Sequence, residues 1–274
     1  MRIFLFLSFL FFSNSIFAQF SEEKILTACE VCGASDIFSA DLDGDGDIDV
    51  LSASRWDDKI AWYENEGAGR FSQQIIISNQ ADAASSVHAA DLDGDGDMDV
   101  LSASSSDDKI AWYQNDGVGR FSEQIIISTQ ANGARSVHTA DLDGDGDIDV
   151  LSASSSDDKI AWYENDGAGR FSQQIIISTQ ANGARSVQTA DLDGDGDMDV
   201  LSASSFDAKI AWYENQLNYP SISGTTFWDK NENGIKDNSE SILENIPIHL
   251  MLYPLIPMQK EYFDFMWLII LPIQ

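Results

Sequence analysis

The stretch DLDGDGDIDVLSAS, residues 41–54, occurs four times in this chain of 274 residues, with Ile or Met at its eighth position. Each copy continues into KIAWY, and the period is 50 residues. The copies 91–140 and 141–190 differ at only five positions. A fixed period of this length is typical of repeat architectures, in which each unit buries its apolar faces against its neighbours. The copies begin at Asp41, Asp91, Asp141 and Asp191.

Each copy of the loop places carboxylates at positions 1, 3, 5 and 9, a glycine at position 6 and an aspartate carbonyl at position 7. This is the oxygen-rich spacing of a calcium-binding loop. Position 12 is Ser52 rather than Glu, and strands rather than helices are expected on both sides, so an EF-hand is disfavoured. We therefore predict one structural Ca²⁺ ion in each loop. The predicted ligand residues are Asp41, Asp43, Asp45, Asp47, Asp49, Asp91, Asp93, Asp95, Asp97, Asp99, Asp141, Asp143, Asp145, Asp147, Asp149, Asp191, Asp193, Asp195, Asp197 and Asp199.

The charge of the chain is concentrated in these loops. The formal net charge is −31, and four loops with five aspartates each hold 20 of the 46 acidic residues. Carboxylates at such fixed spacing repel one another unless a cation lies between them, whereas a solvated acidic face would spread its charge. The acidic balance argues against nucleic acid or an anionic membrane as partner, and 43% hydrophobic residues are enough for a packed core.

The N-terminus has the pattern of a signal peptide, residues 1–18. Arg2 precedes the apolar run Ile3–Phe12, and small and polar residues lead to a predicted cleavage after Ala18. The run is too short to span a bilayer, so we expect a secreted or cell-surface protein without a membrane span. Cys29 and Cys32 form a CxxC pair between strand-like runs, which favours a local disulfide or free thiols over zinc or redox chemistry.

Four short strands are predicted within one unit, at Ser85–Ala90, Met98–Ser104, Lys109–Gln114 and Phe121–Ser128. Their apolar runs are continuous rather than alternating, as in strands that are covered on both faces. Turn residues such as Asn-Asp-Gly recur between the runs, and the density of glycine and β-branched residues excludes helices. The sequence therefore predicts an all-β fold, a β-propeller of four four-stranded blades over residues 19–216.

The ends of the repeat array are irregular. The first three strands occur four times, but the fourth strand is missing after Gln216. Phe20–Thr27 (FSEEKILT) is similar to that missing strand, so we expect it to complete the last blade and close the ring. An open array, or part of a larger ring, is the competing interpretation.

The loop, the following DVLSAS and the segments KIAWYEN and NDGxGRF resemble the FG-GAP/VCBS repeats of integrin α-subunit β-propellers and bacterial surface proteins. The resemblance covers about residues 20–215. It implies a calcium-binding hairpin loop in each blade and a role in adhesion or ligand binding. The family's usual seven blades contrast with the four expected here.

A second module is predicted at residues 217–250. Its loop has oxygen ligands at positions 1, 3, 5, 7, 9 and 12, including the terminal Glu that binds calcium through both oxygens. The segment resembles the calcium-binding B repeat of Sdr-type surface proteins, an Ig-like β-sandwich, here truncated. The hydrophobic tail 251–274 does not continue that pattern, and we interpret it as a truncated or frame-shifted end rather than a membrane anchor. The predicted ligands are Asp229, Asn231, Asn233, Ile235, Asp237 and Glu240.

Two further sets of residues were considered as sites. His88 and His138 precede the metal loop, but Phe38 and Gln188 hold the matching places, so no catalytic or metal role is expected. The recurring tryptophan of KIAWY is expected to pack between blades, with a sugar-binding row as the alternative. These tryptophans are Trp62, Trp112, Trp162 and Trp212.

The sequence favours a binding protein over an enzyme. No nucleophile elbow, zinc-protease motif or P-loop is present, and every pair of carboxylates lies in a repeated loop rather than in one distinctive constellation. We therefore expect an exported, calcium-binding adhesion or recognition module for an extracellular protein or glycan. The alternative is a carbohydrate-binding propeller that assists a polysaccharide-degrading system.

Overall fold

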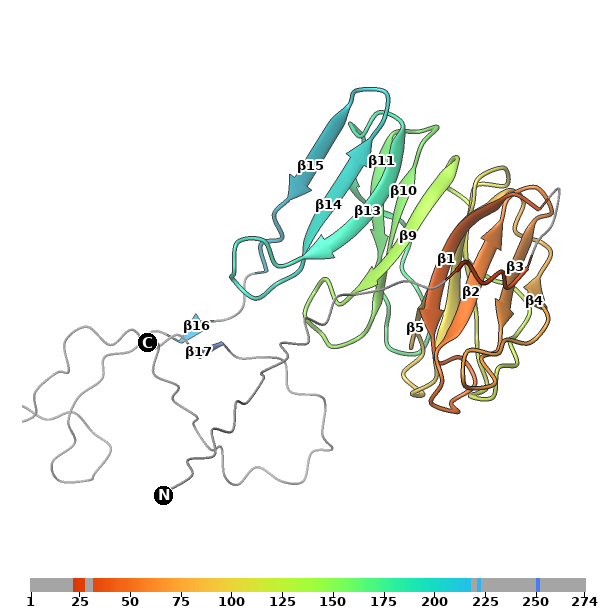
Figure 1. Ribbon diagram of the computed structural model, residues 1–274. Coiled ribbons are helices and arrows are strands. Elements are labelled where there is room, and N and C mark those ends of the chain that lie inside the picture. The colour runs from red at the N-terminus through yellow and green to blue at the C-terminus, as the bar shows by residue number, and fades with distance from the viewer. Residues whose placement is uncertain (1–21, 28–31, 218–220, 223–249, 252–274) are drawn as a thin grey trace, which may run out of the picture.

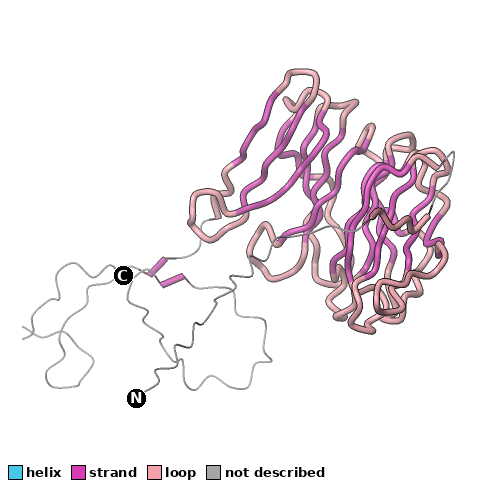
Figure 2. Tube along the Cα trace, in the orientation of Figure 1, coloured by secondary structure: helices cyan, strands magenta, loops and turns pink. Residues whose placement is uncertain are grey.

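The structure is a computed structural model that describes residues 22–27, 32–217, 221–222 and 250–251. All regular elements in this part of the chain are β-strands, and none is a helix (Figure 2). Four antiparallel sheets follow one another along the chain, each built as an up-and-down meander. The described residues also contain no helix that has the length and apolar character to cross a membrane.

The first three sheets have four strands each. The first sheet contains β1 (Ala34–Ala40), β2 (Asp49–Ser54), β3 (Lys59–Tyr63) and β4 (Ile75–Ser78). The second contains β5 (Ala84–Ala90), β6 (Asp99–Ser104), β7 (Lys109–Tyr113) and β8 (Ile125–Ser128). The third contains β9 (Ala134–Ala140), β10 (Asp149–Ser154), β11 (Lys159–Tyr163) and β12 (Ile175–Ser178).

The fourth sheet has three strands. It contains β13 (Ala184–Ala190), β14 (Asp199–Ser204) and β15 (Lys209–Tyr213). A separate pair is formed by β16 (Ser221–Ile222) and β17 (Leu250–Met251). The predicted Ig-like module and its loop, residues 229–240, lie outside the described residues.

The four sheets stand side by side as blades of an arc (Figure 1). Their first strands β1, β5, β9 and β13 pack against one another in chain order and line the axis. Within the described part of the chain, the hydrophobic core consists of three clusters, each lying between two successive sheets rather than within one. Leu51 and Ile60 of the first sheet, for example, pack with Val87 and Tyr113 of the second. This arrangement confirms the all-β, propeller-like fold and explains why the strands are apolar on both faces.

The predicted ring closure is wrong for the residues that the structure describes. Glu22–Thr27 form no strand and are exposed, and the fourth sheet remains three-stranded. A physical reason is visible in the alignment with the other fourth strands, because Lys24 stands where Ile75 begins the apolar run of β4. A lysine at that place favours water over an apolar sheet face. Cys32 is disulfide-bonded, which agrees with the first of the two predicted states, a disulfide, rather than free thiols.

Candidate metal loops and the axial pocket

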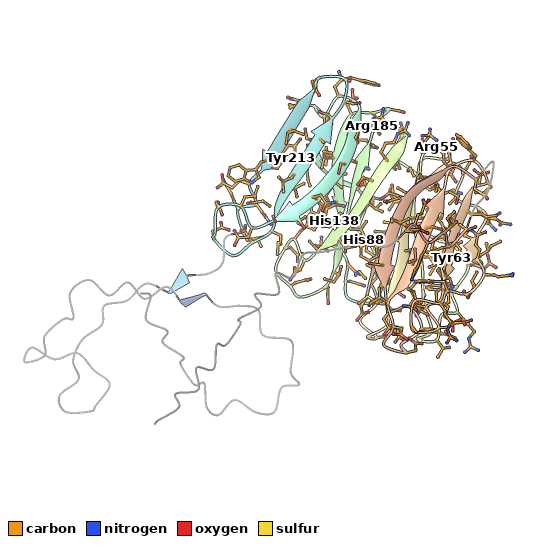
Figure 3. All side chains as sticks on the ribbon, in the orientation of Figure 1. Arg55, Tyr63, His88, His138, Arg185 and Tyr213 are labelled. Carbon is orange, nitrogen blue, oxygen red and sulfur yellow. The ribbon has the colours of Figure 1, made fainter. Side chains whose placement is uncertain are left out.

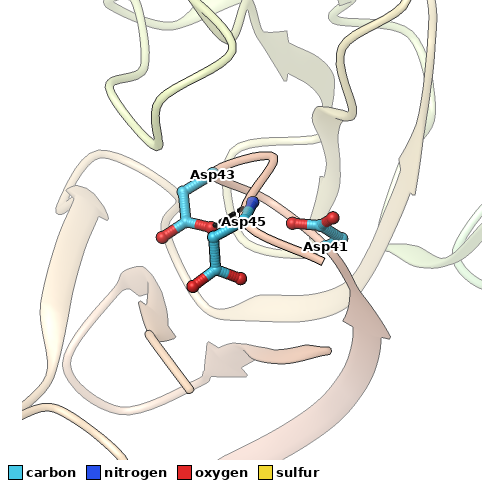
Figure 4. Close-up of side chains that lie close together, drawn as sticks. All are labelled: Asp41, Asp43 and Asp45. Atoms are coloured by element: carbon cyan, nitrogen blue, oxygen red, sulfur yellow. Dashed lines mark hydrogen bonds between the residues drawn. The ribbon is translucent and has the colours of Figure 1, made fainter. Parts of the chain in front are cut away.

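Each predicted calcium loop connects the first and second strands of a sheet, at the same end of all four sheets. In every loop three carboxylates lie with ligand atoms within 4.8 Å of one another. Positions 1 and 3 always take part, joined by position 5 in the first loop and by position 9 in the other three. The sets are Asp41, Asp43 and Asp45; Asp91, Asp93 and Asp99; Asp141, Asp143 and Asp149; and Asp191, Asp193 and Asp199. Figure 4 shows the first set.

The loop holds its shape through hydrogen bonds to its own carboxylates. The Asp41 carboxylate accepts the N–H groups of Gly44 at 2.8 Å and Gly46 at 3.0 Å. The Asp43 carboxylate accepts the N–H of Asp45 at 3.2 Å, the dashed line of Figure 4. Gly46 has φ 92°, a conformation that is open to glycine and strained for other residues. The tight turn therefore brings the carboxylates of Asp41, Asp43 and Asp45 close together.

Position 9 ties the loop to the sheet. The Asp99 side chain is fully buried, and its two oxygens accept the backbone N–H groups of Leu92 at 2.9 Å and Asn115 at 2.8 Å. Burial raises the pKa of Asp99 to about 7, and the repulsion of Asp93 and Asp95 adds to this effect. A cation between these carboxylates would favour their charged forms.

The residues present fit a hard cation such as calcium. All donors in the three-residue sets are carboxylate oxygens, the ligands that Ca²⁺ prefers. Oδ1 of Asp93 is buried and accepts no hydrogen bond from any described residue. The side chain of the position 7 aspartate turns away from the set, as in Asp97, which lies against Gly117. Its predicted contribution is its carbonyl oxygen, and the complete ligand list remains a prediction.

The asparagine that follows the third strand was not singled out by the sequence analysis. Asn115 is buried, and its side-chain amide donates to the carbonyls of Leu42 at 2.7 Å and Met98 at 2.9 Å. It thus joins the metal loop of its own sheet to the loop of the preceding sheet. The same bond links Asn165 to Leu92 and Asn215 to Leu142. The signal was the asparagine that follows KIAWYE or KIAWYQ in every copy.

A polar pocket of about 520 Å³ lies where the first strands of all four sheets meet. Because four sheets contribute to it, it occurs once, whereas the hollows beside the metal loops recur between sheets. At the positions that line this pocket, the four copies of the repeat carry different residues. A comparison of the copies could therefore have pointed to the pocket. Its wall includes Asp36, Phe38, His88, Arg135, His138 and Arg185.

Three arginines gather at the end of the sheets opposite the metal loops. Arg55 follows β2, and Arg185 lies near the start of β13 (Figure 3). Arg135 lies near the start of β9. Burial and the positive charges of Arg55 and Arg185 lower the pKa of Arg135. None of the three makes an ion pair with a described residue. The single acidic residue of the pocket, Asp36, already accepts hydrogen bonds from Ser86 and the N–H of Val87.

The histidines face the axis instead of filling an outer surface. The rings of Phe38 and His88 lie 4.2 Å apart, and those of His88 and His138 lie 5.0 Å apart. Burial lowers the pKa of His88 to about 4, and His138 adds to this by repulsion. His138 also shares a 3.2 Å hydrogen bond with Thr189. The stack thus packs the first strands together.

Three of the four KIAWY tryptophans, Trp62, Trp112 and Trp162, pack between sheets, as the core interpretation predicts. Trp62 and Trp112 are buried, and each meets a phenylalanine of the following sheet, Phe121 or Phe171, edge to face. Trp162 is half-buried and Trp212 is exposed at the end of the arc. A continuous sugar-binding row is therefore not formed by these four rings.

These observations define a propeller-like repeat protein with one acidic, cation-compatible loop per sheet. The chain belongs to the FG-GAP-like repeat family, whose profile matches residues 41–102, 91–152 and 141–202. The relationship to Sdr-type B repeats is not shown by this comparison. No curated protein matches the chain.

The solved structures that are similar to this chain include the following two. One is an Agrocybe aegerita lectin that recognises non-reducing terminal N-acetylglucosamine, with 21% identity and a TM-score of 0.47. The match covers 67% of this chain and 53% of the lectin, so the chain spans about half the lectin's length. The other is the Tc holotoxin pore of Photorhabdus luminescens, with 20% identity, a TM-score of 0.39, and coverage of 66% of this chain and 9% of that one.

The Asp93→Ala variant is expected to bind one calcium ion fewer than the unchanged chain. Asp93 belongs to the carboxylate set of the second loop, so its loss leaves too few oxygen ligands there and spares the other loops. Isothermal titration calorimetry gives the stoichiometry directly. Asp82→Ala, an aspartate outside the loops, serves as control and should keep the full number. An unchanged stoichiometry in Asp93→Ala would contradict the assignment of this loop.

Proposed function

We propose that the chain is an exported, calcium-stabilised recognition module for an extracellular protein or glycan that carries acidic groups. The observation that carries the proposal is the division of the sheets into two ends. The metal loops at one end are nearly identical in all four copies, whereas the axial pocket and the turns at the other end differ between copies. A constant end suits a structural role, and a variable end suits contact with a ligand.

The variable end also has the side chains that recognition surfaces use. Trp56 and Phe206 are exposed there, where the other copies have serine. Arg55, Arg135 and Arg185 form a local positive site on a chain of charge −31. Exposed aromatic and arginine side chains are enriched in binding hot spots, and arginine pairs well with carboxylate and sulfate groups. Export is supported by the signal-peptide pattern of residues 1–18.

Calcium in this proposal holds the loops and takes no part in chemistry. The carboxylates of positions 1, 3, 5 and 9 and the carbonyl of position 7 would hold the ion. The asparagine side chain of the next sheet would then donate its hydrogen bond to an ordered loop. Recognition rather than catalysis is proposed because the one carboxylate of the pocket, Asp36, is hydrogen-bonded to Ser86, and no histidine of the described residues is hydrogen-bonded to this serine as a base.

The double variant Arg135→Ala/Arg185→Ala is expected to lose at least about tenfold in ligand affinity, because hydrogen bonds to charged groups contribute about 1.5–3 kcal/mol each. The measurement is retention on an array of acidic and neutral glycans and matrix proteins, with and without calcium. The matched control is Arg120→Ala/Arg170→Ala, which removes two arginines at the metal-loop end. Equal retention by both double variants would contradict the proposed ligand face.

A further inference from the structure

The first sheet meets the second, and the second meets the third, through a knob and a socket. The knob is a tryptophan of one sheet, and the socket is a glycine and a phenylalanine of the next. Trp62 lies 6.3 Å from Phe121 between ring centres, and a Cβ added to Gly119 would lie 2.6 Å from the Trp62 ring. Trp112 repeats the contact with the following sheet, since a Cβ on Gly169 would lie 2.5 Å from its ring. Only glycine leaves room for the knob.

The last sheet presents a knob without a socket. Trp212 is 49% exposed, whereas Trp112 is 4% exposed. Ile210 is 77% exposed, whereas its counterpart Ile160 is completely buried. Leu192 is also exposed, and no described asparagine side chain donates to its carbonyl, although Leu42, Leu92 and Leu142 each receive such a bond.

The first sheet presents a socket without a knob. Apart from the chain neighbours of Gly69, no described residue has an atom within 4 Å of the place that a Cβ on Gly69 would take. Ile37 is 71% exposed, whereas its counterpart Val87 in the second sheet is 2% exposed. The side chain of Asn65 donates to Ile48 of its own sheet and to no other described carbonyl, while its counterparts each also reach a preceding sheet.

We propose that the first sheet of a second copy of this chain covers the open face of the last sheet. The two ends carry opposite halves of a contact that the chain itself forms between its sheets. Trp212 would enter the Gly69 socket, Ile210 would be covered by the Ile37 face, and Asn65 would donate to the Leu192 carbonyl. Such contacts are head-to-tail, so they either close into a ring or continue as an open chain.

One position departs from the internal pattern. Asp108 and Asp158 each accept the backbone N–H of a glycine in the next sheet, Gly133 at 2.7 Å or Gly183 at 2.8 Å. The last sheet has Ala208 at this place and lacks the acceptor. The contact between copies therefore has one hydrogen bond fewer than the contacts within the chain, and it is expected to be reversible.

Sedimentation of the full chain in calcium tests the proposal. The unchanged chain is expected to sediment as two or more copies at high concentration. Ile210→Asp and Ile37→Asp each place a charge in one half of the contact, and each should raise the dissociation constant at least about thirtyfold. Both isoleucines are exposed, so the thermal melts should stay unchanged. Ile126→Asp, an exposed isoleucine of the second sheet, is the matched control and should associate normally.

Mixing the two variants distinguishes head-to-tail association from other arrangements. Ile210→Asp retains an intact first sheet, and Ile37→Asp retains an intact last sheet, so the mixture should form pairs although neither variant does so alone. A monomeric unchanged chain would overturn the proposal, because the open face would then be bare or covered by another part of the same chain. Association that survives in Ile37→Asp alone would overturn it as well, since two last sheets would then be in contact.

Discussion

Removal of calcium with EGTA is expected to lower the melting temperature of the chain by about 10–20 °C. At a tenfold excess of calcium over the dissociation constant, each site stabilises the folded chain by about 1.4 kcal/mol, so four sites contribute about 5–6 kcal/mol. For a domain of this size, 1 kcal/mol corresponds to about 2–4 °C. Differential scanning calorimetry before and after chelation measures the shift.

The structural reason is that the loops accept the asparagine hydrogen bonds that join successive sheets. Without the ion, the carboxylates of Asp91, Asp93 and Asp99 repel one another within a distance of 4.8 Å. This repulsion also weakens the position of Asn115, because its backbone N–H donates to Asp99 and its side chain donates to the preceding loop. Restored calcium should restore the melt, and magnesium at the same concentration should do so less well, because Mg²⁺ requires a smaller octahedral site. A melt that is indifferent to EGTA would exclude the structural role of calcium.

Replacement of Trp112 by alanine is expected to reduce the free energy of unfolding by about 3–5 kcal/mol. The side chain is 4% exposed and packs against Phe171 and Gly169, so its loss leaves a cavity between the second and third sheets. Chemical denaturation, followed by circular dichroism, gives the difference.

The control for this prediction is Trp56→Ala. Trp56 is 71% exposed at the variable end, so its removal should change the stability little. If Trp112→Ala instead kept its stability and lost glycan retention, the tryptophans would act as a sugar platform. That result would favour the carbohydrate-binding alternative over packing between sheets.

The strands were predictable because each is encoded locally. The run KIAWY and the turn Asn-Asp-Gly fix the third strand and its end without help from distant residues, and the structure has Lys109–Tyr113 as a strand. Phe121 was predicted to begin the fourth strand, but the regular strand begins at Ile125. Phe121 makes only an isolated bridge to Asn115, because it serves as the socket for Trp62 of the preceding sheet.

The closure of the array and the axial pocket were not predictable in the same way. Closure depends on the rotation between sheets, and that rotation is the sum of many small packing contacts rather than the property of any segment. The prediction of closure relied on the similarity of FSEEKILT to a fourth strand and gave too little weight to Lys24. The pocket was missed because its arginines are about 50 residues or more apart in sequence and come together only when the first strands meet.

The identity of the repeats has a consequence for how the chain folds. β2, β6, β10 and β14 all read DVLSAS, and β3, β7, β11 and β15 all read KIAWY, so a wrong pair of strands is as favourable as a right one. The correct pairing of strands is therefore favoured only by chain entropy, because closing a loop that is 50 residues longer costs about 2 kcal/mol more. Short hairpins that form early can establish the correct pairing of strands within one chain. At high protein concentration, however, two chains can exchange whole repeat units at no energetic penalty.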